Sequence, residues 1–169
     1  MRLIGTVCIA LSCLMYGLSY MRSQSRRLTE LDSAAFMLGL MRAELSARLT
    51  PLPELVSLLK ERVRPPSSEF LGKLEDRLWR LGECDFPELW SGCVRESYRE
   101  LTADELELLE RLGGILGRYD IDKQLQELEL CRESFDSAAG LARRELPVGR
   151  RLHLGLSCGL GALLIIVLL

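Results

Sequence analysis

Two uncharged segments near the ends of the chain constrain its fold more than any other feature. Residues 3–21 read LIGTVCIALSCLMYGLSYM, and residues 152–169 read LHLGLSCGLGALLIIVLL with one His near the start. As an α-helix, the first segment is about 28 Å long, close to the roughly 30 Å hydrocarbon core of a bilayer. Both segments are apolar on every side, so we predict a transmembrane helix at residues 1–21 and another at 152–169. A buried core helix is the alternative for each.

Charge is distributed unevenly along the chain. Residues 28–142 hold 14 Lys and Arg against 23 Asp and Glu, a net charge of −9. Two basic collars border this acidic middle, and they consist of Arg22, Arg26, Arg27, Arg143, Arg144, Arg150 and Arg151. Split collars do not suit nucleic acid, which needs one basic face. They suit contact with lipid head groups at two points. Because positive residues stay cytoplasmic, we predict a cytoplasmic domain over residues 22–151.

The N-terminal segment has a second interpretation, as a cleaved signal peptide. Arg2 followed by an apolar stretch fits that pattern, and ALSC, which ends at Cys13, is similar to a lipoprotein cleavage site. This site lacks the usual Leu three residues before the Cys, and three arginines shortly downstream oppose export. We therefore expect a retained span, with cleavage as the alternative.

Sequence signals of catalysis are absent. The chain has one His and no phosphate-binding loop, dinucleotide fingerprint or nucleophile elbow. The six cysteines form no CxxC pair and cannot complete a zinc set, so free thiols are expected, with a Cys84–Cys93 disulfide as the alternative. We predict no enzyme, cofactor, metal or small-molecule substrate. A carboxylate pair brought together by folding is the alternative that sequence spacing leaves open.

Apolar residues at helical spacing fill the middle of the chain, and no alternating strand pattern occurs. Thr50 and Pro51 predict an N-cap and a first helical residue, while Asp85 with Glu88 and Thr102 with Glu105 predict capping boxes. The predicted helices cover 23–49, 51–63 and 67–81, followed by one that begins after Asp85 and includes Val94, one that begins after Thr102 and ends near Arg118, and one over 121–146. The fold class is therefore all-α: an antiparallel bundle of about six helices, with the first and last leading into transmembrane helices.

Three glycines interrupt the helix that begins after Thr102. Gly113, Gly114 and Gly117 each cost about 0.8–1 kcal/mol relative to Ala inside a helix. Gly113 and Gly117 are four residues apart, so they lie on one strip, beside a core face predicted to include Leu108 and Leu112. Such a strip allows a neighbouring backbone to approach closely, and we expect the last long helix to be that neighbour. A helix that ends or kinks at the glycines is the alternative.

Two sequence blocks carry a resemblance to a known family. The first has the pattern LGxxLGRxDxxxQ and consists of Leu112, Gly113, Leu116, Gly117, Arg118, Asp120 and Gln124. The second has the pattern E…TPLxE and consists of Glu44, Thr50, Pro51, Leu52 and Glu54. With their order and the apolar ends, these blocks resemble the stage III sporulation protein AB family over nearly the whole chain.

The resemblance implies a function that the residues alone do not show. Members of that family belong to an assembly in the mother-cell membrane that forms a channel to the engulfed forespore. Their soluble domain is similar to the inner-membrane platform protein of type II secretion and type IV pilus systems, which implies contact with a companion cytoplasmic ATPase. The expected function is thus a non-enzymatic scaffold in the cell membrane on the mother-cell side. The alternative is a membrane-tethered regulator that sequesters a soluble partner.

Several residues are candidates for contacts within this assembly. We expect the acidic residues Glu105, Glu107 and Glu110 to face a partner. Arg118, Asp120 and Gln124 are interpreted either as a partner contact or as a junction between two helices. Gly155 and Gly159 form a GxxxG pair suited to packing between membrane helices. The expected partners are lipids and other subunits of the channel, and self-association is left open.

Overall fold

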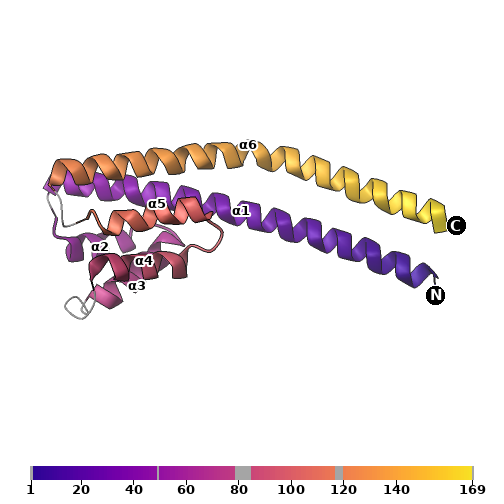
Figure 1. The fold of residues 1–169 in the computed structure, drawn as a ribbon, viewed down its shortest axis with the longest axis horizontal. Coiled ribbons are helices and arrows are strands. Elements are labelled where there is room, and N and C mark those ends of the chain that lie inside the picture. The colour runs from indigo at the N-terminus through magenta and orange to yellow at the C-terminus, as the bar shows by residue number, and fades with distance from the viewer. Residues whose placement is uncertain (1, 49, 79–84, 117–119, 169) are drawn as a thin grey trace. The chain divides into compact units, whose positions relative to one another are not determined.

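The computed structural model is all-α over the residues that it describes, which confirms the all-α part of the predicted fold class (Figure 1). The helices are α1 (Arg2–Arg48), α2 (Leu52–Lys60), α3 (Ser67–Leu78), α4 (Phe86–Ser97), α5 (Ala103–Gly113) and α6 (Ile121–Leu168). The described backbone covers residues 2–48, 50–78, 85–116 and 120–168. In the two terminal segments, side chains are described only at Ser12, Met15 and Ser19 and over residues 22–47 and 120–144.

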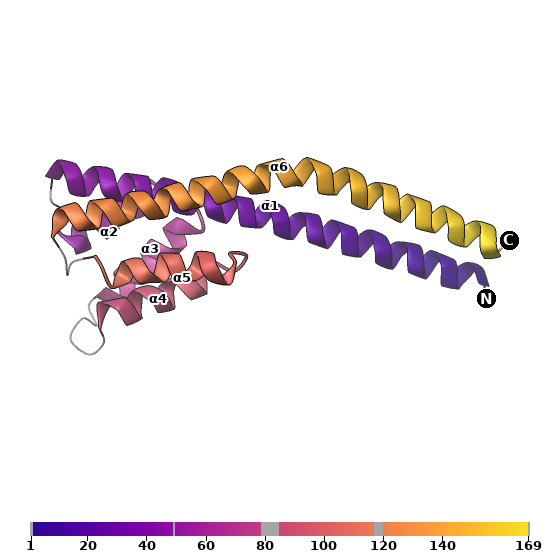
Figure 2. The same ribbon diagram turned by 45° about the horizontal axis from the view of Figure 1, so that its top comes forward.

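The chain divides into two compact units. The first unit combines Met1–Arg26 with Gly140–Leu169, whose helices run side by side in opposite directions (Figures 1 and 2). No helix in the described part of the chain is both long and apolar enough to cross a membrane. The segments predicted to do so lie almost entirely among residues whose side chains are not described, so the spans stay a prediction.

The second unit, Arg27–Ala139, is a helical bundle. Helices α2 to α5 lie on one side of the layer that residues 27–48 of α1 and 121–139 of α6 form (Figure 2). Consecutive helices pack on each other, α2 on α3, α3 on α4 and α4 on α5. Short links force this arrangement, because a few residues can only turn the chain back antiparallel to the helix before.

The bundle core consists of the apolar faces that helical spacing predicted, with one shift. Its largest fully buried side chains include Trp90, Tyr98, Phe70, Phe135, Leu31 and Leu38. In α5, Leu112 is buried as predicted, but in the preceding turn Leu109 is the fully buried residue and Leu108 is only half-buried, so the prediction was wrong at Leu108. A helical period of 3.6 fits either of two adjacent leucines, and only the position of α4 decides between them.

Helix α5 begins at the predicted capping box. The Glu105 backbone N–H donates to Thr102 Oγ1 at 3.4 Å, and the Thr102 N–H donates to Glu105 Oε2 at 2.8 Å. Two backbone donors without helical partners are thereby satisfied. This cap also fixes the direction in which α5 leaves the α4–α5 link.

Two other predicted helix starts were wrong in detail. Pro51 is the N-cap of α2 and not its first helical residue, because its ψ of 143° is extended and its carbonyl accepts from Leu55 N–H at 2.9 Å. Asp85 is the N-cap of α4, as predicted, but its side chain makes no capping hydrogen bond. The carbonyl of Asp85 accepts from the Glu88 N–H at 3.0 Å, so the capping box is not formed.

Candidate partner-binding site

Glu105 connects the start of α5 to α1. Its carboxylate accepts from Arg27 Nη2 at 2.6 Å while also closing the capping box with Thr102. Burial raises the pKa of Glu105, but the Arg27 guanidinium and the Thr102 donors outweigh burial and leave the pKa below its ordinary value. Arg27 was predicted to belong to the basic collar, and Glu105 was predicted to face a partner. In the structure, they bind each other inside the bundle.

A second carboxylate, that of Glu30 on α1, binds the link between α4 and α5. Its oxygens accept from the Glu100 N–H at 2.9 Å and the Arg99 N–H at 3.3 Å. Glu30 is only 9% exposed, and burial raises its pKa above the ordinary glutamate value. Sequence reasoning missed this residue, since nothing near Glu30 signals a backbone segment 70 positions further on.

One turn after Glu30 on α1, a chain of three hydroxyl groups leads from Ser33 through Ser67 to Tyr98 in the same link. Ser33 Oγ lies 2.8 Å from Ser67 Oγ, which lies 2.7 Å from the hydroxyl of fully buried Tyr98. Ser33 Oγ is also 2.9 Å from the Arg64 carbonyl oxygen in the α2–α3 link. Burial raises the pKa of Tyr98, so its hydroxyl stays protonated and able to donate. Residues 30–33 of α1 therefore hold both links at one end of the bundle.

The glycine at the end of α5 packs against an aromatic side chain. A Cβ on Gly113 would lie 2.6 Å from Trp90 Cγ and 2.7 Å from Trp90 Cβ. The Trp90 indole N–H donates to the Leu109 carbonyl, one turn before the glycine, at 2.8 Å. The predicted close packing at Gly113 is confirmed, but its neighbour is a side chain of α4 and not the last helix. Helix α5 also ends at this residue, and Gly117 lies outside the described residues.

Gly113→Ala is expected to lower the free energy of unfolding of the full chain by about 1–3 kcal/mol, as overpacked cores do. The clash acts against a favourable helix propensity change of about 1 kcal/mol. Gly114→Ala is the matched control, because a Cβ there would meet only the Arg111 carbonyl oxygen, at 3.5 Å. Urea unfolding of both variants in detergent measures the difference, and equal stabilities would contradict this packing.

The acidic residues of α5 divide into paired and unpaired groups. Glu110 makes a two-bond contact with Arg95, at 2.6 and 2.8 Å, and is largely covered. On the exposed face, Asp104 and Glu107 make no ion pair with any described residue. Of the three predicted carboxylates, only Glu107 is therefore displayed without an intramolecular partner, and Asp104 joins it on the same strip.

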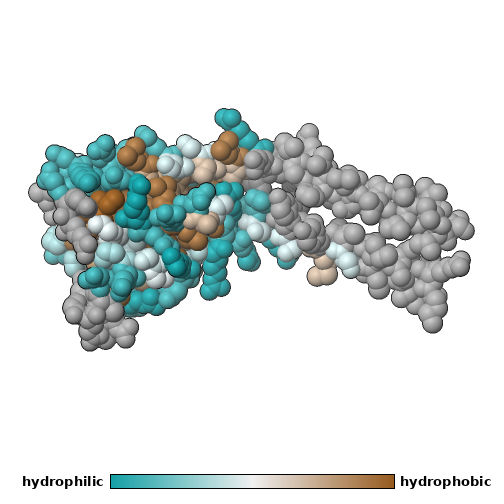
Figure 3. All heavy atoms as spheres, in the orientation of Figure 1, coloured by the Kyte–Doolittle hydropathy of each residue, from teal (hydrophilic) through white to brown (hydrophobic). Residues whose placement is uncertain are grey.

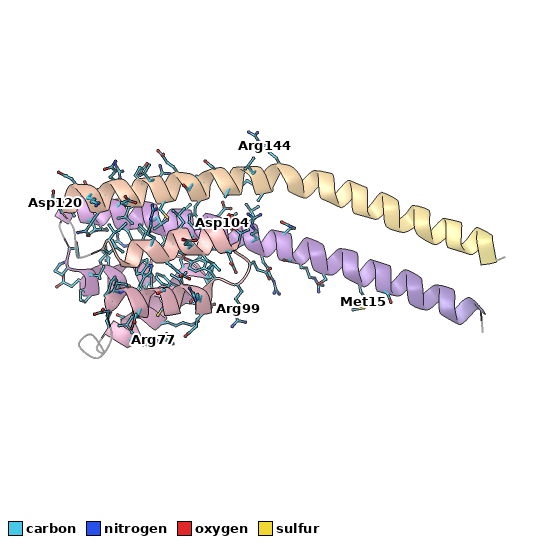
Figure 4. The ribbon with its side chains drawn as sticks, in the orientation of Figure 1. Met15, Arg77, Arg99, Asp104, Asp120 and Arg144 are labelled. Carbon is cyan, nitrogen blue, oxygen red and sulfur yellow. The ribbon has the colours of Figure 1, made fainter. Side chains whose placement is uncertain are left out.

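The second half of the LGxxLGRxDxxxQ block lies at the start of α6. Asp120 is exposed at the end of the bundle where α6 begins. Asp104, in the first turn of α5, lies far from it (Figure 4). The Asp120 carbonyl accepts from the Gln124 N–H at 3.1 Å, which is the first turn of the helix. Arg118 is outside the described residues, so the choice between contact and helix junction stays open.

The E…TPLxE block joins α1 to the end of α2. Glu44 accepts from Arg62 Nη1 at 2.8 Å, and its side chain is 14% exposed. Thr50 is half-buried, and Pro51 is exposed as the N-cap of α2. The structure thus gives Glu44 an intramolecular ion pair, while the role of Thr50 and Pro51 in partner binding stays a prediction.

The collar arginines differ in their surroundings. Arg22, Arg26, Arg143 and Arg144 are exposed, whereas the side chains of Arg150 and Arg151 are outside the described set. Gly155 and Gly159 lie in the same segment, for which no surroundings are described, so the predicted span packing is not tested.

The two described cysteines of the bundle are free thiols. Cys93 and Cys131 are both buried and unbridged, so the alternative of a Cys84–Cys93 disulfide was wrong. Burial raises the pKa of Cys131 to about 12 and that of Cys93 above its ordinary value. Both thiols therefore stay protonated and act as small core side chains.

Comparisons with known proteins agree with the resemblance in the sequence. The chain matches the family model of stage III sporulation protein AB over residues 2–169. Its fold is similar to a solved structure of a stage III sporulation protein AB, with a TM-score of 0.62 and 19% identity over 72% of this chain and 97% of that chain. The search of curated proteins gave no match. Because the family model covers nearly every residue, the chain belongs to the stage III sporulation protein AB family.

Proposed function

We propose that this protein is a non-enzymatic scaffold subunit of the channel complex between mother cell and forespore. Two terminal spans would anchor it in the mother-cell membrane, and the helical bundle would engage the companion ATPase in the cytoplasm. Family membership supports the sporulation role. The exposed arginines at 22, 26, 143 and 144 support contact between the chain and lipid head groups.

One observation carries the proposed partner contact, namely the exposed acidic strip of α5. The opposite face of this helix is fixed in the core by Leu109, Leu112 and Gly113. Asp104 and Glu107 point away from that face, while neighbouring carboxylates are neutralised by Arg27 and Arg95. Arg111 follows Glu107 by one turn on this face, but its guanidinium is paired with Glu127 at 3.1 Å. Asp104 and Glu107 thus form an acidic surface suited to a basic patch on a partner, where complementary charge speeds association and sets orientation.

The test compares two double variants with the same change in net charge. Asp104→Lys with Glu107→Lys reverses the strip, whereas Glu69→Lys with Asp76→Lys reverses two exposed acids on α3. We expect the first pair to weaken binding of the full chain to the purified ATPase several-fold at low salt, and less at high salt because salt screens exposed charges. Calorimetric titration measures the affinity.

Equal weakening by the two double variants would show that only net charge matters and would contradict the strip. Unchanged binding in both would also contradict it. Glu105 and Glu110 are not suitable for this test, because reversing either would break a contact to Arg27 or Arg95 inside the bundle.

A further inference from the structure

The link between α4 and α5 has one side chain without a role in the fold. Of its five residues, Tyr98 and Leu101 are buried in the core, Thr102 caps α5, and Glu100 is half-buried. Arg99 is exposed and extends from the link into solvent (Figure 4). Its guanidinium makes no ion pair with any residue that the structure describes. The link therefore displays one cation that the bundle does not neutralise.

Helix α1 holds this link in place. The link and the first turn of α5 are bound by three groups on residues 27–33 of α1, namely the guanidinium of Arg27, the carboxylate of Glu30 and the hydroxyl chain that begins at Ser33. These groups come from two successive turns of the helix. The link cannot leave α1 without breaking them, so its distance from a membrane depends on its position along α1.

The predicted N-terminal span ends close to this part of α1. Met21 is the last residue of that span and precedes Glu30 by nine residues within one helix. At 1.5 Å per residue, Glu30 is therefore about 14 Å or less from the end of the span, whatever angle α1 makes with the bilayer. Lipid head groups occupy roughly 5–8 Å of this distance. The rest is about one Debye length, roughly 8 Å at physiological ionic strength, and a long arginine side chain covers part of it.

Two exposed collar arginines lie between the predicted span and the link. Arg22 and Arg26 precede Glu30 at spacings of four residues, so they share one strip of α1 with the carboxylate that binds the link. Along α1, the order from the span is thus Arg22, Arg26 and then the link with Arg99. An anionic lipid surface attracts basic residues in this position.

Nearby carboxylates do not neutralise Arg99. Glu30 accepts from backbone N–H groups of the link, and Glu105 is paired with Arg27. Asp104 is exposed, but it belongs to the first turn of α5 and lies apart from Arg99 in Figure 4. In Figure 3, hydrophilic side chains predominate on the side of the bundle where α4 and α5 lie. Such a surface suits polar head groups and not the hydrocarbon core of a bilayer.

The neighbouring α2–α3 link does not offer the same surface. It carries exposed Arg64 but also exposed Glu61, and exposed Glu69 follows in the first turn of α3. Ser33 binds the Arg64 carbonyl one turn further from the predicted span than Glu30 is. The α4–α5 link is therefore both nearer to the span and better suited in charge.

We infer that the α4–α5 link lies against the membrane surface and that Arg99 binds the anionic head groups of its lipids. This contact comes from the middle of the chain and adds to the collars at its two ends. It rests on the membrane anchoring proposed above. Helix α5 runs away from the link, so Glu107 stays accessible to a cytoplasmic partner.

Photo-crosslinking of the full chain to lipid tests the inference. Benzoylphenylalanine replaces Ala103, which is exposed beside the link, and the chain is reconstituted in phosphatidylglycerol vesicles that contain an alkyne-tagged phospholipid. Met15, exposed in the predicted span, is the control for anchoring, and Glu88, exposed at the other end of α4, is the control for the bundle surface. We expect lipid adducts from positions 15 and 103 and none from 88.

The controls separate this inference from the proposed anchoring. An adduct from position 15 without one from 103 would overturn the inference and leave the anchoring intact. No adduct from position 15 would overturn both. Equal adducts from positions 88 and 103 would show that the link has no special contact with lipid, which also overturns the inference.

Variants of Arg99 test the ionic part of the contact. Arg99→Glu is expected to reduce the adduct from position 103 about fivefold or more, which is the factor that one basic residue contributes near an anionic surface. Arg99→Lys should keep the adduct because it keeps the charge. Phosphatidylcholine vesicles, which carry no net charge, should lower the wild-type adduct in the same way and leave that from position 15 unchanged. An adduct from 103 unaffected by Arg99→Glu or by the loss of lipid charge would contradict the binding of anionic head groups.

Discussion

Trp90→Ala is expected to lower the free energy of unfolding by about 3–5 kcal/mol, as large-to-small changes at fully buried aromatic residues do. The Trp90 ring is inaccessible to solvent and contacts Phe70 edge to face, with centroids 4.8 Å apart. It also covers Gly113 and donates to the Leu109 carbonyl. The Trp90 side chain therefore connects α3, α4 and α5.

Two further variants divide this effect into its causes. Trp90→Phe keeps most of the buried ring but removes the indole donor, so we expect a loss of about 0.5–1.5 kcal/mol from the hydrogen bond, in addition to any loss of packing. In the Trp90→Ala background, Gly113→Ala should no longer be destabilising, because its clash partner is gone. Chemical unfolding of the four proteins in this cycle measures the coupling, and additive changes would show that the two residues do not interact.

The local structure of this bundle could be predicted from sequence because local physical chemistry determines it. Apolar spacing predicted all six helices, and the Thr102 capping box needs only residues three positions apart. The close packing at Gly113 was predicted for the same reason. Its neighbour was not, since glycine spacing shows that something approaches closely without showing which helix provides it.

The long-range contacts of the candidate site could not be predicted in this way. Arg27 reads as one of three arginines after an apolar segment, yet it pairs with Glu105, 78 positions away. The sequence predicted Glu105 and Glu107 alike to face a partner, but the packing of α5 on the core turns Glu105 inward and leaves Glu107 exposed. Such distinctions depend on the angle at which a helix is fixed, which a single sequence does not specify.

Glu30→Ala is expected to lower the free energy of unfolding by about 3 kcal/mol, since hydrogen bonds to a charged group contribute about 1.5–3 kcal/mol each. The change leaves the backbone N–H groups of Arg99 and Glu100 without their acceptor in the α4–α5 link. Glu54→Ala is the control, because Glu54 is exposed on α2 and should change stability by about 0.5 kcal/mol or less. Urea unfolding of the full chain measures both, and equal effects would contradict the role given to Glu30.

The pH dependence of Glu30→Gln tests the same contact by its sign. Burial raises the pKa of Glu30, so the folded protein binds this proton more tightly than the unfolded chain does. The stability due to this proton is complete below the unfolded glutamate pKa of about 4.3 and is lost as pH rises through the folded value. Wild type should therefore lose stability relative to Glu30→Gln over this interval, while the other carboxylates cancel in the comparison. A difference that grows in favour of wild type as pH rises would mean that the backbone donors outweigh burial and that the Glu30 pKa is lowered.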